Sequence, residues 1–156
     1  MATVNTTTTW PGTIRLASDA DTPRIGELYR ICQWADHGVD WTRPGVGAWW
    51  LIAEREGQVL GALQLIASKP FGYIGDIVVH PSERGQSGNG TSGLCQTFGI
   101  LARTLYASAL YILEAAGVEV VMGIVAESAT SLQRVLQRHG ATDLGHYVLM
   151  ARRTGA

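Results

Sequence analysis

A glycine-rich segment near the middle of the chain has the residue types of an anion-binding loop. Its glycines, Gly85, Gly88, Gly90 and Gly93, are separated only by small or polar residues. An apolar run rich in β-branched residues, Ile74–Val79, precedes the loop, and apolar residues at helical spacing follow it. Glycines let the backbone approach a ligand closely, while the free N–H groups and the dipole at a helix start favour negative charge. The segment therefore predicts a phosphate-binding loop between a strand and a helix.

The same glycines also contain a literal dinucleotide-binding pattern, Gly-x-Gly-x-x-Gly, at residues 88–93. That pattern normally begins directly at a strand end and is followed by an acidic residue about 20 positions later. Here the eight residues 80–87 separate the strand end at Val79 from Gly88, and no acid ends a next strand at that distance. The context therefore argues against a nicotinamide dinucleotide. A flexible connector without any ligand is the remaining alternative.

The residues around the strand end resemble a known family. The run Val79-His80-Pro81-Ser82-Glu83-Arg84-Gly85 is similar to the GNAT superfamily of acyl-CoA-dependent acyltransferases, in which a strand ending Val-x-Pro is followed by Arg-Gly-x-Gly-x-Gly and a helix. The second half of the motif departs from the family. Counted from Arg84, Ser87 and Asn89 stand at the usual glycine places, and one inserted residue explains both differences. The resemblance extends more weakly from Thr13 to Arg152.

This resemblance implies an acetyl-CoA-dependent N-acetyltransferase, in which a primary amine attacks the thioester directly in a ternary complex. It implies that backbone amides at the strand end hold the pantetheine and the acyl carbonyl, and that the loop holds the pyrophosphate, with the Arg84 side chain adding charge-assisted bonds to phosphate. The implied strand residues are Ile77, Val78 and Val79. The implied loop residues are Arg84, Gly85, Gln86, Ser87, Gly88, Asn89, Gly90 and Thr91.

A general base for the amine is harder to place. The family's usual glutamate position aligns with Gly75, which has no side chain. Asp76 is the best candidate, although strict strand alternation puts it on the opposite face from residue 75. The alternative for Asp76 is a structural, hydrogen-bonding aspartate. His80 is a second candidate, for which a solvated histidine at the strand end is the alternative.

The family's usual acid, a tyrosine, aligns with Leu136, so another group must protonate the leaving thiolate. Tyr147 and His146, near the C-terminus, are the candidates, together with solvent. The missing glutamate and tyrosine also favour an alternative function, a non-catalytic acyl-CoA-binding module with the same fold. No Ser/His/Asp arrangement or zinc-ligand spacing is present, so we expect no metal site.

A loop between the first predicted helix and the second predicted strand, Val39–Gly47, occupies the region that covers the acceptor in GNAT folds. Trp41 is the expected wall of that site, because aromatic side chains with a polar edge are common in pockets. Asp40 favours a cationic acceptor, and a solvated surface charge is its alternative. Trp49 and Trp50 begin the next strand, where at least one is expected in the core.

Composition limits the class of protein. The chain has 156 residues, of which 46% are hydrophobic and 16% charged, as expected for one globular domain. The net charge of −1 does not favour a nucleic-acid partner. The first ten residues do not have the pattern of a signal peptide, and charges interrupt the apolar stretch Phe98–Val125, so we expect no membrane span. Cys32 and Cys95 are isolated, as in reduced cytoplasmic proteins.

We therefore expect a cytoplasmic α/β (α+β mixed) protein with a GNAT-like mixed sheet of six or seven strands and helices on both faces. Residues 1–12 are expected to be a flexible lead-in and residues 13–153 a single acyl-CoA-binding domain. The expected acceptor is a small-molecule amine or the amine of a protein or peptide. The sequence leaves open whether the chain forms a homodimer. The expected strands are Thr13–Ala17, Trp50–Arg55, Gln58–Ala67, Phe71–Val79, Val118–Ala126 and Tyr147–Ala151, and the expected helices are Asp21–Asp36, Ser92–Ala116 and Ser128–His139. The fourth and fifth of these strands should be parallel, because a helix crosses between them.

Overall fold

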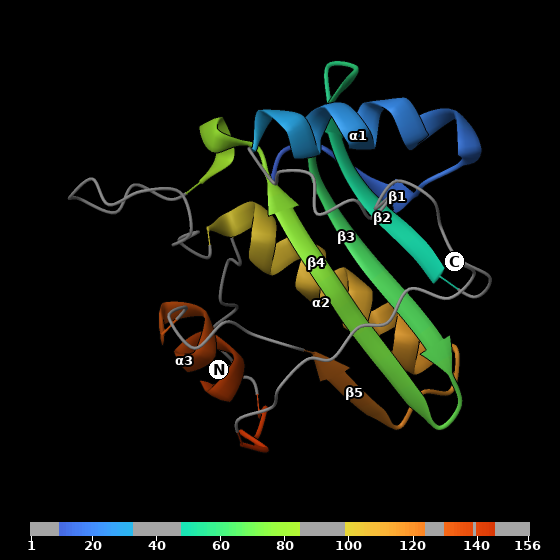
Figure 1. Cartoon of the computed structure of the whole chain (residues 1–156), viewed down its shortest axis with the longest axis vertical. Helices are drawn as coiled ribbons and strands as arrows, with labels where there is room; N and C mark the ends of the chain where they lie inside the picture. The colour runs from blue at the N-terminus through green and yellow to red at the C-terminus, as the bar shows by residue number, and fades with distance from the viewer. Residues whose placement is uncertain (1–9, 33–47, 85–98, 124–129, 139, 146–156) are drawn as a thin grey trace, which may run out of the picture.

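A mixed sheet of five strands, in the order β1-β2-β3-β4-β5, runs through the residues described by the computed structural model (Figure 1). The described residues are 10–32, 48–84, 99–123, 130–138 and 140–145. The strands are β1 (Thr13–Leu16), β2 (Ala48–Arg55), β3 (Gln58–Ser68), β4 (Phe71–Val79) and β5 (Val120–Gly123). The first four form antiparallel pairs, and β4 with β5 is parallel. The predicted mixed sheet and its parallel pair are confirmed, and the expected strand at 147–151 lies outside the described residues.

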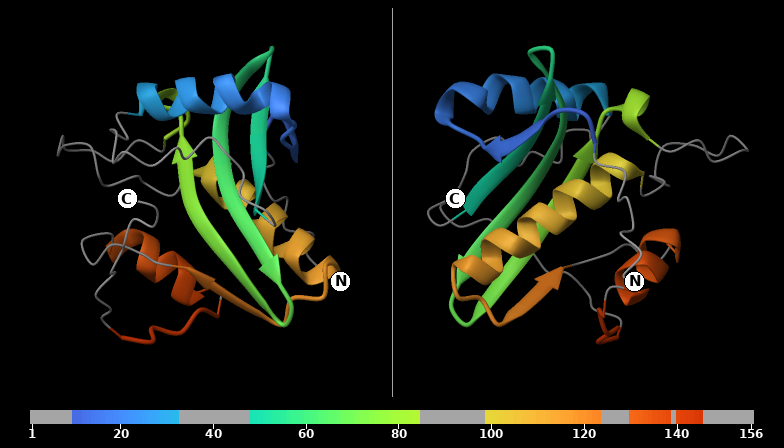
Figure 2. Two further views of the ribbon diagram at one scale, coloured as in Figure 1. Left: turned by 45° about the vertical axis from the view of Figure 1, so that its right-hand side comes forward. Right: turned by 180° about the vertical axis from the view of Figure 1, so that it is seen from behind.

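Helices cover both faces of this sheet, as Figure 2 shows from two sides. The helices are α1 (Thr22–Ile31), α2 (Ile100–Ala115) and α3 (Thr130–Arg138), with short 3₁₀ turns η1 (Asp19–Asp21) and η2 (Pro81–Glu83). Successive residues of a strand point to opposite faces of the sheet, so the side chains of β2 contribute to two separate cores. Leu51 and Ala53 join the α2-side core, whereas Trp50 and Ile52 join the α1-side core.

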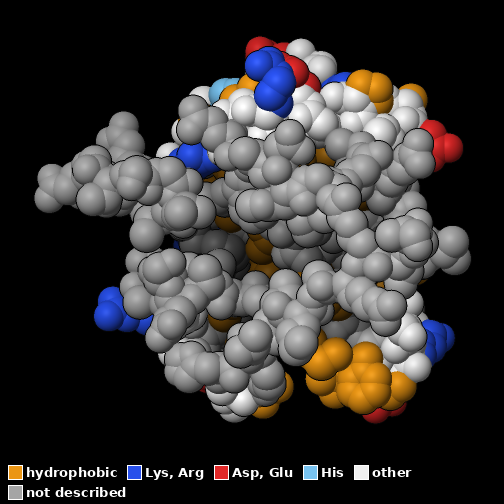
Figure 3. Space-filling view, viewed as in Figure 1, with side chains coloured by type: hydrophobic (Ala, Val, Ile, Leu, Met, Phe, Trp, Pro, Cys, Tyr) orange, Lys and Arg blue, Asp and Glu red, His pale blue; other side chains and the backbone are white. Residues whose placement is uncertain are grey.

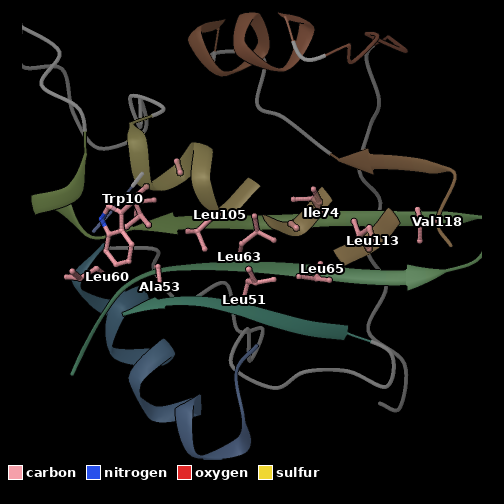
Figure 4. Packing of buried hydrophobic residues seen from close by; sticks show 14 residues of the cluster. Trp10, Leu51, Ala53, Leu60, Leu63, Leu65, Ile74, Leu105, Leu113 and Val118 are labelled. Atoms are coloured by element: carbon pink, nitrogen blue, oxygen red, sulfur yellow. The ribbon is translucent and has the colours of Figure 1, made fainter. Parts of the chain in front are cut away.

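The α2-side core is the larger of the two and is drawn in Figure 4. Leucines of α2, among them Leu105 and Leu113, are fully buried against the sheet, and each such burial stabilises the fold by about 1.5–3 kcal/mol. Gly61 of β3 lets α2 lie close, since a Cβ there would stand 2.8 Å from Leu105 Cδ1. The hairpin that carries Gly61 closes at Glu56 and Gly57, whose φ angles of 53° and 78° suit a tight two-residue turn.

Trp10 packs into the α2-side core, although it falls within the predicted flexible lead-in. Its side chain is 6% exposed, and its indole N–H donates to Glu83 Oε2 at 2.7 Å. The Arg55 guanidinium lies 5.5 Å from the centroid of the indole ring and pairs with Glu83. These contacts join Trp10 to η2 and β2, and the flexible lead-in over residues 1–12 stays a prediction. The single-domain division itself stays a prediction.

Three expectations about the elements need correction. The first helix ends at Ile31, with Cys32 as its C-cap, rather than at Asp36. The helix expected from Ser92 begins only at Ile100, and Gly99 is its extended N-cap instead of an interior residue. Within the described residues, β5 is shorter than the expected strand.

Strand β5 is also exposed, although its β-branched sequence predicts a buried strand. All four of its residues are exposed, with Val120 at 47% and Met122 at 44%. Its place at the end of the described strand order, beyond β4, explains this, because neighbours there cover fewer of its sides. Figure 3 shows hydrophobic side chains grouped at the lower edge of the molecule. No helix in the described ranges combines the length and apolar character needed to cross a membrane.

A buried carboxylate, Asp21, ties the first strand, the first helix and β2 together. It is 3% exposed and accepts from Arg15 Nη1 at 2.8 Å and from Arg24 Nη1 at 3.0 Å. Both arginines also contact Glu54 of β2, at 3.3 and 2.9 Å. The backbone N–H of Ser18 donates to Asp21 Oδ2. Hydrogen bonds from Arg15 and Ser18 outweigh the cost of burial and hold the pKa of Asp21 well below its usual range.

Replacing this aspartate, in Asp21→Asn, should lower the free energy of unfolding by about 2 kcal/mol. The loss is smaller than for a fully buried pair, because the arginines are about a third exposed and screened by solvent. Since the folded-state pKa lies below the unfolded one, the stabilisation is complete above about pH 4 and declines as the pH falls further. Urea unfolding at neutral and acid pH measures both effects. Asp19→Asn, at an exposed neighbour, is the matched control, and equal losses in the two variants would contradict this role.

Candidate active site

Strand β4 is paired with β5 along its first part in the described residues. Their parallel register pairs Phe71–Ile74 with Val120–Gly123 and ends there. Beyond that point, residues 75–79 of β4 have no partner in β5 within the described part of the chain. An extended ligand that pairs with a strand edge uses backbone amides and carbonyls of this kind.

A β-bulge lies at the start of this stretch of β4. The register between β3 and β4 shifts there, so that Gly75 and Asp76 together stand opposite Gln64, between the paired residues Ile74 and Ile77. A bulge adds one residue to one strand and bends it. The bulge therefore changes the direction of the β4 backbone just after the last residue that pairs with β5.

The bulge changes the reasoning about the candidate base. Ile74 and Ile77 both pack against the α2-side core, although residues three apart in a regular strand face opposite sides. Strict alternation therefore fails between them, and the expectation that Asp76 faces away from the side of Gly75 does not follow. The side chain of Asp76 itself is outside the described part of the structure. Its role as base stays a proposal.

At the far end of β4, a cationic side chain meets the start of the predicted loop. Arg84 Nε donates to the carbonyl oxygen of Val79 at 3.0 Å, and the Cys32 thiol donates to the same oxygen at 3.3 Å. Arg84 Nη2 is buried, and no hydrogen-bond partner for it exists among the described residues. Burial raises the pKa of the Cys32 thiol, and the neighbouring guanidinium only partly offsets this rise. The thiol is therefore a neutral donor, whereas Arg84 retains an unused donor that suits an anion.

The turn between β4 and the loop is fixed by its own side chains. His80 Nδ1 accepts from the backbone N–H of Ser82 at 3.1 Å and lies 2.7 Å from Ser82 Oγ, so His80 caps η2. This structural contact accounts for His80 without a role as base. Burial of Glu83 opposes its ionisation, but hydrogen bonds from Trp10 and Arg55 prevail and lower the pKa of this carboxyl. Arg84 is thus presented by a turn anchored to β2 and to Trp10.

On the α1 side of the sheet, three residues on neighbouring strands lie in a row that includes the bulge. Trp50 of β2 pairs directly with Gln64 of β3, and Gln64 lies over Gly75 of β4. Trp50 also contacts Tyr29 of α1 edge to face, with ring centroids 5.7 Å apart. Its indole nitrogen is buried and has no hydrogen-bond partner in the described residues. Trp50 is in the core and Trp49 is exposed, as the sequence predicts of at least one of them.

Gln64 is the residue that sequence reasoning missed at this site. The signal was present, because Gln64 interrupts the otherwise apolar run from Val59 to Ala67 in β3. A half-buried amide in such a run is costly without a partner. The burial pattern of β3 confirms that Gln64 is half-buried between two fully buried leucines.

Of the predicted site residues, Ile77, Val78 and Val79 form the end of β4, and Arg84 bonds to the carbonyl of Val79. Leu136, at the usual tyrosine place, lies on α3 and is half-buried. The other predicted site residues fall outside the described ranges. They are Asp40, Trp41, Gly85, Gln86, Ser87, Gly88, Asn89, Gly90, Thr91, His146 and Tyr147.

Comparison with known proteins agrees with this architecture. The model of the acetyltransferase (GNAT) family matches residues 12–88, which span β1 to the start of the glycine loop. A search of curated proteins finds no match. The chain superposes over nearly its whole length on solved acetyltransferases, so it shares their fold. The match of residues 12–88 to the acetyltransferase (GNAT) family model confirms the resemblance that the strand and loop predicted.

Three solved structures illustrate the similarity of fold. The aminoglycoside N-acetyltransferase AAC(6')-Iy, in complex with the bisubstrate analogue CoA-S-monomethyl-acetylneamine, superposes with a TM-score of 0.68 at 18% identity, over 93% of this chain and 100% of that one. An aminoglycoside acetyltransferase from an uncultured soil metagenomic sample, in complex with sisomicin, gives 0.66 at 14% identity, over 92% and 97%. The ribosomal-protein-alanine N-acetyltransferase from Brucella melitensis biovar Abortus 2308 gives 0.65 at 17% identity, over 90% and 99%.

Proposed function

We propose that the chain is an acetyl-CoA-dependent N-acetyltransferase that acts on a primary amine. The observation that carries this proposal is the stretch of β4 from Gly75 to Val79, which has no β5 partner in the described residues and leads directly to Arg84. An extended pantetheine chain suits such an edge, because it carries amide groups that pair with backbone N–H and C=O. The solved structure of AAC(6')-Iy with CoA supports the same donor.

The residues of this chain fit the donor at two places. Backbone groups of Ile77, Val78 and Val79 are proposed to hold the pantetheine and the thioester carbonyl. The buried Nη2 of Arg84 lacks a partner in the described structure, and it is proposed to donate to the pyrophosphate, since guanidinium–phosphate bonds are among the stronger hydrogen bonds. The loop residues 85–91 are proposed to add backbone N–H groups to the phosphates.

The reaction needs few groups from the protein. The amine nitrogen forms a bond to the acetyl carbon, the C–S bond breaks, the nitrogen loses a proton and the thiolate gains one. Positioning contributes much of the acceleration, because it turns an encounter between two molecules into a step within one complex. We propose Asp76 as the acceptor of the amine proton, and Tyr147, His146 or solvent as the donor to the thiolate.

The acceptor is proposed to be a small-molecule amine or the amine of a protein or peptide. Structures with the same fold are named as acetyltransferases of aminoglycosides and of a ribosomal-protein alanine, so sisomicin and an alanine-initiated peptide are rational first probes. Trp41 and Asp40 are proposed to contact this acceptor from the loop before β2.

Donor binding is tested by thermal unfolding with CoA, acetyl-CoA, NAD and ATP side by side. A ligand that binds only the folded state stabilises it by about 2.7 kcal/mol at a hundredfold excess over Kd, which raises Tm by several degrees. We expect this rise with CoA and acetyl-CoA and none with NAD. A rise with NAD alone would contradict the assignment of the loop, and no rise with any of the four would favour an inert connector.

A further inference from the structure

We propose that the Gln64 amide orients the acceptor amine at the β-bulge, as a substrate-contacting residue of the transferase. This inference rests on the proposed function, because it concerns the same reacting centre. Gln64 belongs to β3, the neighbour of the strand that is proposed to hold the thioester. It stands opposite both bulge residues, Gly75 and Asp76, and next to the stretch of β4 that begins at Ile77.

The missing side chain at position 75 makes room for this amide. A Cβ built on Gly75 would lie 2.7 Å from Gln64 Oε1 and 3.3 Å from Gln64 Cβ. The first distance is too short for any real Cβ, so the amide occupies the space that a side chain at 75 would need. A side chain at 75 would therefore displace the amide from its present place, which glycine at 75 leaves open.

A buried donor lies beside Gln64. Its cross-strand neighbour Trp50 has a buried indole N–H that lacks an acceptor among the described residues. A buried polar group without a partner costs about 1–3 kcal/mol. The Trp50 indole is such a group, and it lies across the strand pair from the half-buried Gln64, where a polar ligand is proposed to bind.

The chemistry of an amide defines what Gln64 does there. Its Oε1 accepts a hydrogen bond from an amine N–H, and its NH₂ donates to an oxygen of the acceptor. An amide does not take up the proton, so Gln64 fixes the direction of the nitrogen lone pair while another group receives the proton. Orientation of this kind acts through binding and alignment. Loss of the Gln64 amide should therefore change the kinetics with the amine and leave the affinity for CoA unchanged.

Steady-state kinetics on Gln64→Ala and a control variant test this assignment, with sisomicin and an alanine-initiated peptide as amines. Gln64→Ala should lower kcat/KM for the better amine by about 2- to 10-fold, as for a lost hydrogen bond between neutral groups of about 0.5–1.5 kcal/mol. The Kd for CoA should not change. Gln58→Ala, at the exposed start of the same strand, is the matched control and should behave like the unmodified chain.

A second variant separates orientation from packing. Gly75→Ala displaces the amide, so it should reproduce the loss in Gln64→Ala, and the double variant Gly75→Ala/Gln64→Ala should lose little more than either one. Such non-additivity is the signature of two residues that act as a unit. Additive losses, or equal declines in Tm and CoA affinity, would overturn the proposal in favour of a structural role.

The activity of the unmodified chain distinguishes failure of the Gln64 assignment from failure of the proposed function. If it turns over an amine and Gln64→Ala is equally active, the role of Gln64 is overturned while the proposed function stands. If it binds CoA but turns over neither probe amine, the proposed transferase activity on these amines fails, and the role of Gln64 fails with it. Kinetics consistent with the proposal are an active parent chain, a defect confined to the amine, and the non-additive double variant.

Discussion

Replacing Asp76 with asparagine should lower kcat with acetyl-CoA by about 100-fold or more, since a positioned general base contributes 10²–10⁴ to such a step. The bulge places Asp76 beside Gly75 and opposite Gln64, directly before the proposed thioester-binding residues. Asparagine keeps the size of the side chain but does not accept the amine proton. The loss should appear in kcat and in kcat/KM to a similar degree.

The measurement is release of free thiol under saturating acetyl-CoA, with the Kd for acetyl-CoA determined by calorimetry. Affinity for the donor should stay unchanged, because the base acts on the amine. Asp19→Asn, an exposed aspartate far along the chain from the bulge, is the control. Unchanged turnover in Asp76→Asn would remove Asp76 from the mechanism and leave solvent as the proton acceptor.

Replacing Arg84 with alanine should weaken CoA binding by about 10- to 100-fold, which corresponds to a hydrogen bond to a charged group of about 1.5–3 kcal/mol. The expected loss follows from the buried Nη2, which has no partner in the described structure. Titration of CoA against the folded variant measures it directly. Arg84→Lys should recover part of the affinity, because lysine keeps the charge but lacks the planar fork.

Arg84 also bonds to the carbonyl of Val79, so its loss will lower Tm as well. Affinity is therefore compared at a temperature where every variant is folded. Arg103→Ala, on the exposed face of α2, removes the same charge elsewhere and should leave the Kd unchanged. Equal affinities for Arg84→Ala and the parent chain would contradict the assignment of Arg84 to the phosphates.

Local sequence signals predicted the central part of the fold. Strand β4 has the predicted bounds, Phe71–Val79, because its β-branched residues and the proline after it are both local features. The turn at Glu56 and Gly57 was equally readable, since a glycine between two strand-like runs marks a hairpin. The parallel pairing of β4 and β5 followed from the helix that must cross between them.

Features that depend on distant contacts were not readable in the same way. Trp10 is a single aromatic residue without periodicity, and its burial depends on Glu83, which is 73 positions away. The exposure of β5 depends on its place in the strand order and not on its β-branched composition. The start of α2 at Ile100 was missed because the apolar spacing in the sequence continues upstream of its N-cap, Gly99.

The candidate site was predictable only in part, for a similar reason. Arg84 and the end of β4 belong to one continuous motif, so the sequence placed them together. The bulge at Gly75 and Asp76 arises from the register between two strands, which strict alternation cannot reveal. Gln64 became a candidate only when that register showed which residue of β4 it covers.

The central claim, that this chain transfers an acetyl group to an amine, is tested most directly by thiol release. The purified chain is mixed with acetyl-CoA and, in parallel, with sisomicin, an alanine-initiated peptide and no amine. We predict thiol release that depends on an amine, together with an acetylated product identified by mass spectrometry. Binding of CoA without amine-dependent release or product would contradict the transferase and support the non-catalytic acyl-CoA-binding module instead.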